Sequence, residues 1–432
     1  MDKNSFKFKK IEGKNFAKIS GDHNAIHVDE NFGYNSIYGE NIVHGVFVLF
    51  KFLKKIKFNE HFSYLKILFI DTTKYNYKIN IRKINIYKKK KIYELVQLNN
   101  VIARIEVGFF FDDIKIEKLK KVSLKKKYLI NKKKINKFNF KNSPINLNIA
   151  LCNLSKYVGM FFPGENSIIS EINIHNVNFN YGSNVLISSD SSLAKKGFPI
   201  IYNTLVYENY NIQFKTLIRP KLKVKFKKPE SKILKQVKLI KNNILIIGAS
   251  SGIGKDLLQL FLYNKKVKVI ATYYKNNIFK KNKNLITKKV NIEKNLSLIY
   301  SIIKKYNPIA IYYFPTPKIL FKSFKDKNFI NLYKKYFIEI PIKIIKFSNK
   351  YECCFFYPST TYNNSSSPYS IIKLKAEKEI KKIKNNKVII NIAKIPGINT
   401  KQTLSLISKN LPDFRDLLSK NKEIFKKVFF KN

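Results

Sequence analysis

The chain has 432 residues, more than one ordinary domain holds, so we expect two or three domains. It carries 84 basic and 28 acidic residues, yet the lysines are scattered and no nucleic-acid-binding module is recognisable, so we expect no nucleic-acid partner. Hydrophobic residues make up 45% of the chain, enough for packed cores, and no uncharged apolar run approaches the ~20 residues that span a bilayer.

The cysteines and the N-terminus indicate a reducing compartment. Cys152, Cys353 and Cys354 provide no disulfide framework, and two of them are adjacent in the sequence. The first residues, Met-Asp-Lys-Asn-Ser-Phe-Lys, contain no apolar signal core. We therefore expect a cytoplasmic protein. The excess of lysine is more typical of a chain encoded by an AT-rich genome than of a nucleic-acid-binding surface.

The first expected domain, 1–115, combines a polar motif, a buried helix and a set of strands. Residues 16–33 form the polar motif, and residues 40–55 predict a helix that is apolar nearly all round and therefore buried. A sheet wrapped around one long helix predicts an α+β domain. The strand candidates are 75–87, 90–98 and 100–111.

The polar motif resembles the MaoC-like, (R)-specific enoyl-CoA hydratases, which have the hotdog fold. This resemblance implies that Asp22 and His27 hold a water molecule and pass its proton between them, as general acid–base chemistry on a 2-enoyl thioester requires. It also implies substrate binding by Asn24, in the loop, and by Gly45. At Gly45, free amides at the start of the helix would bind the thioester carbonyl. The alternative interpretation is a structural turn with no catalytic role.

The middle of the chain has weaker signals. We predict a basic linker over 116–143, and a second, non-catalytic hotdog half over 144–228, with extended runs at 200–208 and 211–226. The alternative for this region is a domain of unrelated fold. A second basic linker is expected over 229–241.

From residue 242 the pattern changes to alternating strands and helices, which predicts a Rossmann-type, doubly wound parallel α/β sheet over 242–432. The glycines of 244–254 follow an apolar strand and open a helix, an arrangement that lets backbone approach a pyrophosphate. The expected strands are 244–248, 267–273, 286–290, 309–314, 353–358 and 387–393.

This glycine pattern, together with Tyr369 and Lys373 at helical spacing after Ser359, resembles the short-chain dehydrogenase/reductase family. The resemblance implies that Tyr369 is the acid/base, that Lys373 tunes its pKa and binds ribose, and that Ser359 binds the substrate carbonyl, with Thr360 or Thr361 as the alternative. The cofactor-binding residues that it implies are Gly248, Ser250, Ser251, Gly252, Ile253, Gly254, Thr272, Lys275, Asn291, Tyr369, Lys373, Pro396, Gly397 and Thr400.

The end of the second strand of this domain, Ala271-Thr-Tyr-Tyr-Lys-Asn-Asn, lacks the carboxylate that binds the ribose hydroxyls of NAD. Thr272 and Lys275 suit a 2′-phosphate, so we expect NADP(H) to be preferred over NAD(H). No metal site is expected.

The two motifs together predict a bifunctional enzyme that acts on the β-carbon of an acyl-CoA or acyl-carrier-protein thioester. One site would hydrate or dehydrate the thioester, and the other would reduce a 3-ketoacyl group with NADPH. The alternatives are a dehydratase fused to a reductase of another carbonyl compound, and a non-catalytic cationic binding protein. A homo-oligomer is expected from both family resemblances.

Overall fold

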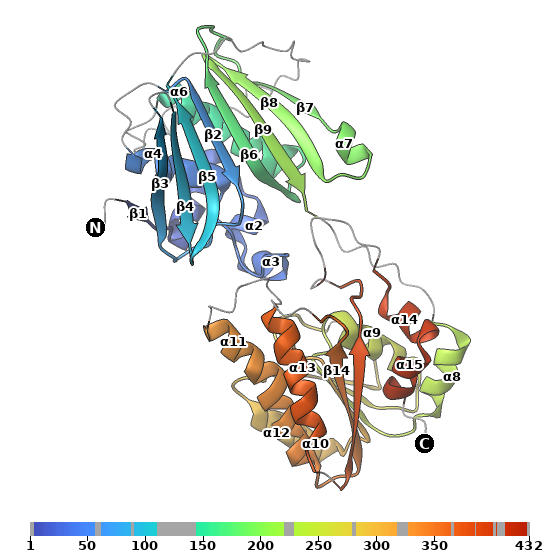
Figure 1. Cartoon of the computed structure of the whole chain (residues 1–432). Helices are drawn as coiled ribbons and strands as arrows, with labels where there is room; N and C mark the ends of the chain where they lie inside the picture. The colour runs from blue at the N-terminus through green and yellow to red at the C-terminus, as the bar shows by residue number, and fades with distance from the viewer. Residues whose placement is uncertain are drawn as a thin grey trace. The chain divides into compact units, whose positions relative to one another are not determined.

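The computed structural model divides the chain into two compact units, which are described separately (Figure 1). The first comprises Met1–Lys221, and the second comprises most of Leu222–Asn432. The predicted linker over 116–143 lies outside the described residues. The structure describes residues 4–56, 62–87, 90–109, 144–219, 229–278, 282–317, 327–363, 367–384, 386–400, 403 and 411–429.

The first unit is built on one antiparallel sheet of nine strands, in the order β1-β3-β4-β5-β2-β6-β9-β8-β7. Outward from the centre, the strands of one half follow the order 2-5-4-3 and those of the other follow 6-9-8-7. In each half the first strand in the chain is central and the other three follow in reverse chain order, so the two halves have the same connectivity. The halves are joined where β2 pairs with β6, with Ile67 opposite Ile172. The strands are β1 (Ser5–Phe6), β2 (Tyr64–Phe69), β3 (Ile79–Tyr87), β4 (Lys90–Gln97), β5 (Asn100–Gly108), β6 (Ser167–Asn176), β7 (Leu186–Asp190), β8 (Ile200–Tyr207) and β9 (Tyr210–Ile218).

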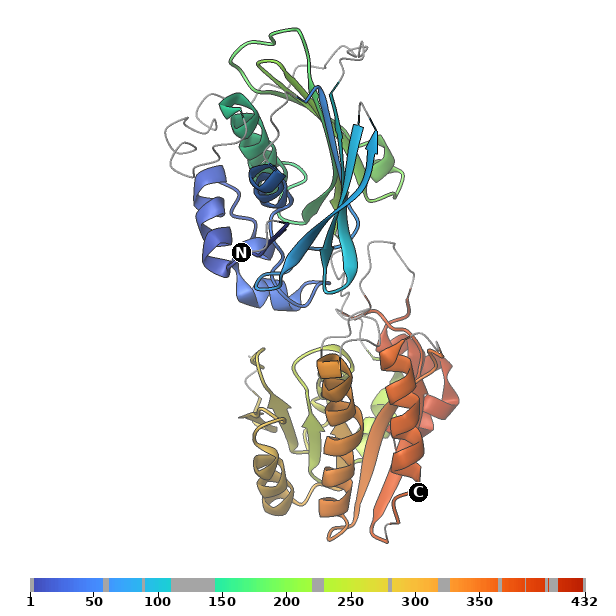
Figure 2. The same cartoon turned by 60° about the vertical axis from the view of Figure 1, so that its left-hand side comes forward.

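Each half is preceded by one buried helix, and both helices lie on the same face of the sheet (Figures 1 and 2). Helix α4 (Gly45–Ile56) begins five residues later than its sequence predicts and buries seven apolar side chains. Helix α6 (Ile145–Lys156) continues into the π-helix η2 (Tyr157–Phe161), and its residues from Leu147 to Ser155 are all buried. Apolar side chains from both halves form a single core.

Three helices before α4 carry the polar motif. Helix α1 (Lys10–Ser20) ends at Gly21, which has a left-handed φ of 72°. The short helices α2 (Ala25–Val28) and α3 (Glu30–Asn35) follow, and Asn24 and Asp29 cap their N-termini. The buried amide of Asn41 donates to the carbonyl oxygens of Ile26 and Asp29, and so fixes this segment close to the start of α4.

The second unit contains six parallel strands in the order β12-β11-β10-β13-β14-β15, which is the 3-2-1-4-5-6 order of a doubly wound dinucleotide-binding sheet. This topology confirms the predicted α/β class of the C-terminal part. Each predicted strand is present, with ends shifted by at most two residues. The strands are β10 (Ile244–Ile247), β11 (Val269–Tyr273), β12 (Leu285–Lys289), β13 (Ala310–Tyr313), β14 (Cys353–Thr360) and β15 (Val388–Ile395).

Helices cover both faces of this sheet, as the all-apolar strand β10 requires. Side chains of Ile244 and Ile246 pack into one core, and those of Leu245 and Ile247 pack into the other, because successive side chains of a strand point to opposite faces. The helices of the first core are α8 (Ser231–Leu239), α9 (Gly252–Phe261), α14 (Phe414–Lys420) and α15 (Lys422–Val428). Those of the second are α10 (Leu296–Tyr306), α11 (Lys327–Lys334), η3 (Lys335–Glu339), α12 (Ile340–Ser348) and α13 (Pro368–Lys381).

One of the predicted boundaries is wrong. The expected linker 229–241 contains helix α8, whose Ile233 and Val237 are buried in the core of the second unit. The predicted segments 1–115 and 144–228 belong to one body, because strands of both form one sheet around one core. That 144–228 is a second hotdog half stays a prediction, now with a repeated strand order in its support.

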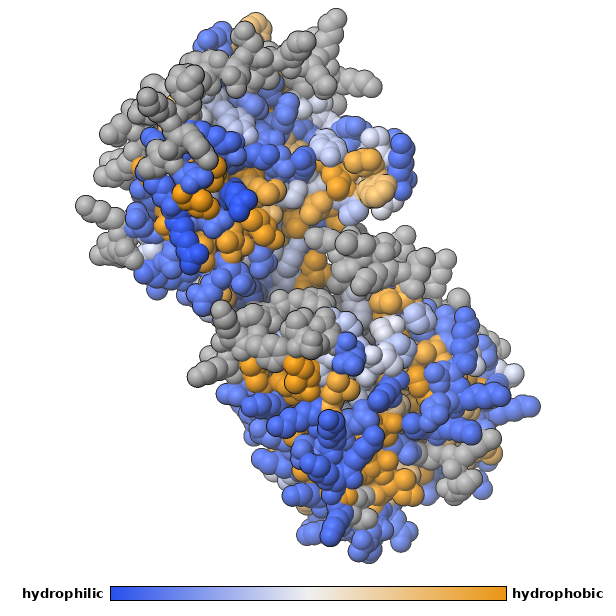
Figure 3. Space-filling model, in the orientation of Figure 1, coloured by the Kyte–Doolittle hydropathy of each residue, from blue (hydrophilic) through white to orange (hydrophobic). Residues whose placement is uncertain are grey.

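Hydrophilic side chains are spread over the visible surface of both units (Figure 3). On the face shown in Figure 3, hydrophilic side chains spread over each unit and are not gathered into one stripe. Among the described residues, no helix is both long enough and apolar enough to cross a membrane.

Candidate functional site

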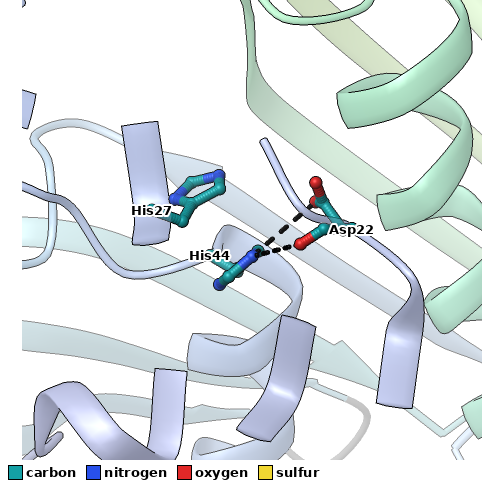
Figure 4. Close-up of side chains that lie close together, drawn as sticks. All are labelled: Asp22, His27 and His44. Atoms are coloured by element: carbon teal, nitrogen blue, oxygen red, sulfur yellow. Dashed lines mark hydrogen bonds and ion pairs between the residues drawn. The ribbon is translucent and has the colours of Figure 1, made fainter. Parts of the chain in front are cut away.

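Three polar side chains from consecutive segments of the first unit lie close together (Figure 4). Asp22 lies in the loop after α1, His27 on α2, and His44 directly before α4. Asp22 and His44 are 4% and 1% exposed, which is rare for such polar groups unless they are hydrogen-bonded. The structure therefore brings the two predicted hydratase residues together and adds a third polar side chain, that of His44.

The Asp22 carboxylate is held by two donors from different parts of the chain. The hydroxyl of Ser155, on α6, donates to its Oδ2 at 2.7 Å, and the amide of Asn24 donates to its Oδ1 at 3.2 Å. Burial raises the pKa of Asp22, and interactions with His27, Ser155 and Asn24 oppose that shift. Such a carboxylate is a stronger base than an exposed one, which suits it to accept a proton from water.

His27 and His44 are both neutral at pH 7. Burial lowers the pKa of each histidine to about 3. His27 Nδ1 lies 2.8 Å from the carbonyl oxygen of Ile42, which assigns the proton to Nδ1 and leaves the Nε2 lone pair free to accept. His44 Nε2 lies 3.1 Å from the main-chain oxygen of Asp22 and 4.0 Å from its Oδ2. Because the imidazole is neutral and donates to the main-chain oxygen, the longer contact is not an ion pair.

These three residues border a cavity of about 230 Å³ between the two halves of the sheet. Gly45 lies on it, so the first amides of α4, which have no partner within the helix, are close to the histidines. A Cβ at Gly45 would lie 3.0 Å from the ring of Phe69, so close packing is also a reason for this glycine. The residues lining the cavity include Asp22, Asn24, His27, Tyr38, His44, Gly45, Phe69, Thr73, Ser155, Val158, Gly159, Ser167, Ile169 and Leu217.

Asn24, predicted to bind substrate, also has a local role. Its side-chain oxygen accepts from the amide of Ile26 at 3.3 Å, and so caps α2. Its main-chain amide holds Asp22. Asn24 thus shapes the loop that presents Asp22 and His27, and it lines the cavity as well.

The same cluster has the composition of a metal site but not its geometry. Ligand atoms of Asp22, His27 and His44 all lie within 4.8 Å of one another. The two imidazole rings, however, are stacked, with centroids 3.8 Å apart and planes inclined by 27°. Nitrogen lone pairs lie in the ring planes, so two stacked rings do not direct them at one ion. The arrangement suits proton transfer by Asp22 and His27, which we call the dyad, better than it suits metal binding.

In the second unit, the glycine-rich turn joins β10 to α9 at the carboxyl edge of the sheet. Gly248 has φ 80°, and a Cβ at Gly254 would overlap the carbonyl oxygen of Gly248, so the turn and the close packing of helix on strand both require glycine. At Gly252, with φ 54°, the nearest atom to an added Cβ is in Thr400, 3.8 Å away. The backbone there is therefore open to a phosphate group, as a dinucleotide cofactor needs.

The other residues predicted to border the cofactor also lie at this edge of the sheet, but Thr272 has a different role from the predicted one. Thr272 is buried, and its hydroxyl accepts from the amide of Gly248 at 3.1 Å. It therefore fixes the turn and is not presented to a 2′-phosphate, whereas Lys275 is exposed. Ser250, Ser251 and Ile253 belong to the turn and the first residues of α9, Asn291 follows β12, and Pro396, Gly397 and Thr400 follow β15.

The hydroxyl beside Tyr369 is that of Thr360, not that of Ser359. Thr360, the last residue of β14, has its side chain near Tyr369, on α13, where it opposes the rise in the tyrosine pKa that burial causes. Ser359 instead donates to the carboxylate of Glu377 at 2.8 Å in the interior. Successive strand residues point to opposite faces, so only one of the two can reach the tyrosine. The carbonyl-binding role of Ser359 stays a prediction, and its bond to Glu377 favours the alternative, Thr360.

Lys373 is buried one turn after Tyr369. Its ammonium donates to the carbonyl oxygen of Pro358 and lies 4.5 Å from the centre of the Tyr357 ring. Burial lowers the pKa of Lys373 to about 7, and burial also raises the pKa of Tyr369. In this arrangement, burial outweighs the expected lowering of the tyrosine pKa by the lysine.

Comparison with known proteins matches part of the first unit to one family. The model of the MaoC like domain matches residues 2–53, which contain Asp22, His27 and His44. No curated protein matches the chain. Similar solved structures include one described as a MaoC-like dehydratase, which is 8% identical, with a TM-score of 0.35 over 50% of this chain and 96% of that one.

Two other similar structures are short-chain dehydrogenases. One, from Francisella tularensis subsp. tularensis SCHU S4, is 19% identical, with a TM-score of 0.31 over 42% of this chain and 75% of that one. The other, from Burkholderia cenocepacia J2315 in complex with NADP, is 11% identical, with a TM-score of 0.35 over 42% and 82%. The chain thus has a MaoC-like domain at residues 2–53 and, by its own strand order, a dinucleotide-binding type of sheet in its second unit.

Proposed function

We propose that the first unit hydrates and dehydrates 2-enoyl and (R)-3-hydroxyacyl thioesters. The observation that carries this proposal is the convergence of the Asp22 carboxylate and the His27 ring on one cavity, beside the first amides of α4. A base, a water-holding group and amide donors for a developing enolate are what this addition needs.

In this reaction the water would lie between Asp22 and His27 and would donate a hydrogen bond to His27 Nε2 through the hydrogen that stays on its oxygen. Asp22 takes a proton as the water oxygen bonds to Cβ, and the electrons of the double bond move to the thioester oxygen. The amides at Gly45 stabilise that enolate oxygen. Asp22 then returns the proton to Cα, so that the product has gained one molecule of water and the enzyme is unchanged.

We propose that the second unit reduces a 3-ketoacyl group with NADP(H). Gly248, Ser250, Ser251, Gly252, Ile253 and Gly254 would hold the pyrophosphate, and Asn291, Pro396, Gly397 and Thr400 would border the rest of the cofactor. The bound cofactor supplies hydride. Tyr369 donates a proton to the substrate oxygen, and the Thr360 hydroxyl orients that oxygen. The exposed Lys275 and the lack of an acid after β11 support NADPH over NADH.

The substrate would be a thioester of coenzyme A or acyl carrier protein, and the protein a homo-oligomer. The test is to incubate the full-length protein with acetoacetyl-CoA and NADPH and to identify the products by mass spectrometry. We expect 3-hydroxybutyryl-CoA together with crotonyl-CoA. Hydration of crotonyl-CoA with no reduction of acetoacetyl-CoA would support the first site and contradict the substrate proposed for the second.

A further inference from the structure

We infer that the second half of the nine-stranded sheet is part of the hydratase site, with Ser155 positioning the Asp22 carboxylate and Gly159 leaving room for it. This inference rests on the function proposed for the first unit. The inference gives a role to the segment 144–228, which has no Asp–His pair of its own and which the sequence predicts to be non-catalytic.

The first observation is the bond between Ser155 and Asp22. The two residues are 133 positions apart in the chain and are 1% and 4% exposed. The Ser155 hydroxyl donates to Oδ2 at 2.7 Å, while the Asn24 amide donates to Oδ1 at 3.2 Å. With one donor on each oxygen, the plane of the carboxylate is fixed.

The second observation is the missing side chain at Gly159, four residues after Ser155. A Cβ at this position would lie 2.6 Å from the Cγ of Asp22, closer than any carbon can approach without displacing the carboxylate. Gly159 lies in the π-helix η2, an irregularity that is frequent at functional sites. Serine and glycine thus face the same carboxylate from adjacent turns of one helical segment.

These contacts have a chemical consequence for Asp22. Each carboxylate oxygen accepts two hydrogen bonds, so the Ser155 and Asn24 donors still leave an acceptor site for water on each oxygen. A hydrogen bond to the charged form favours ionisation, and Ser155 opposes the rise in the pKa of Asp22 that burial causes. Ser155 would therefore keep Asp22 both ionised and oriented as a base.

The cavity offers a matched control for this role. Ser167, on β6, also belongs to the second half, lines the same cavity and is 2% exposed. Its hydroxyl donates to the carbonyl oxygens of Val158 and Gly164 and not to the carboxylate of Asp22. Removing it deletes a buried hydroxyl of the same kind without changing the hydrogen bonds of the carboxylate.

The experiment measures hydration of crotonyl-CoA against pH by the full-length wild type, Ser155→Ala and Ser167→Ala. We expect Ser155→Ala to lower kcat about tenfold or more, with little change in KM, because it removes a hydrogen bond to a charged group. We also expect the acid limb of its kcat/KM profile to move to higher pH. Ser167→Ala should retain the wild-type acid limb. Equal acid limbs in Ser155→Ala and wild type would overturn the inference.

A second measurement does not depend on turnover. Carboxyl carbon NMR, with the signal of Asp22 assigned by its loss in Asp22→Asn, follows the titration of this group directly. The pKa of Asp22 should be higher in Ser155→Ala than in wild type or Ser167→Ala, and an unchanged pKa would overturn the inference. If Ser155→Ala does not fold, Ser155→Cys, which keeps the volume but is a weak donor, takes its place with the same two outcomes. A wild type that hydrates no enoyl thioester would contradict the proposed function, while the titration would still decide the role of Ser155.

Discussion

The imidazole rings of His27 and His44 are stacked, with centroids 3.8 Å apart. Two charged rings in this arrangement would repel each other, and each already has a pKa of about 3 because it is buried. Both rings are therefore uncharged at any pH at which the protein is expected to work. The cluster thus combines one buried carboxyl group with two neutral imidazoles.

This pair, in which His44 is buried and His27 partly buried, predicts how stability depends on pH. An unfolded histidine titrates near pH 6.5, whereas the folded residues titrate near 3, so the unfolded chain binds more protons between these values. The free energy of unfolding should fall as the pH falls from about 6.5 towards 3, by up to ~1.4 kcal/mol per pH unit for each histidine. Urea unfolding at several pH values should show a shallower slope for His44→Gln. The exposed His23 provides the control His23→Gln, and equal slopes for both variants would contradict the prediction.

Substitution of the dyad should abolish hydration without unfolding the protein. Asp22→Asn and His27→Ala remove the proposed base and the group that holds the water, and such losses lower rates by roughly 10²–10⁴. The measurement is the loss of the conjugated-thioester absorbance of crotonyl-CoA. His23→Ala, an exposed neighbour, should retain the wild-type rate. Wild-type hydration by His27→Ala would exclude the dyad as the site.

Removal of metal ions should leave hydration unchanged. The stacking of His27 on His44 does not direct two lone pairs at one ion, although the three side chains have suitable types and spacing. Rates before and after dialysis against a strong chelator should agree within error. A loss of activity that zinc or another divalent ion restores would show instead that the cluster binds a metal.

Neighbouring residues of β14 should differ in their effects on reduction. Thr360→Val removes the hydroxyl beside Tyr369, and Tyr369→Phe removes the proposed acid, so each should lower NADPH oxidation with acetoacetyl-CoA by roughly 10² or more. Ser359→Ala changes a hydroxyl that donates to Glu377 and should lower stability more than activity. If Ser359→Ala lowered NADPH oxidation more than Thr360→Val, the substrate would lie on the other face of the strand.

Cofactor binding should depend on the packing of two glycines. Gly254→Ala places a Cβ against the carbonyl oxygen of Gly248, so the turn must shift, and we expect NADPH affinity to fall by at least tenfold. The affinity for NADPH can be measured by quenching of intrinsic tyrosine fluorescence or by calorimetry. Hydration by the first unit in the same variant serves as the internal control. Unchanged affinity would mean that the pyrophosphate lies elsewhere.

The sequence was sufficient to predict the parallel sheet because each strand is short, apolar and separated from the next by a helix-length segment. In β10, for example, Ile244 to Ile247 must be buried on both faces, which only helices on each side can achieve. The Asp22 and His27 pair was predictable for a different reason. Its polar residues lie within one continuous motif, so their order in the chain already places them on one loop.

Two parts of the sites were not predictable in this way. Ser359 and Thr360 are adjacent, and which of them faces Tyr369 depends on the pleat of β14, which composition does not reveal. Ser155 and Gly159 reach Asp22 only through the packing of α6 against the first half, and no local pattern marks a serine and a glycine as partners of a distant carboxylate. Helix α8 was missed because its lysines outnumber the two buried residues that fix it.

The pairing of β2 with β6 places two similar halves on one polypeptide. In a dimer of identical subunits, every substitution appears twice, so a change that helps one copy of a site also alters the other. Here each half can change alone. One half carries an acid and a histidine, while the other carries the serine and glycine that face that acid, so that a single asymmetric site can form within a scaffold whose two halves share one strand order.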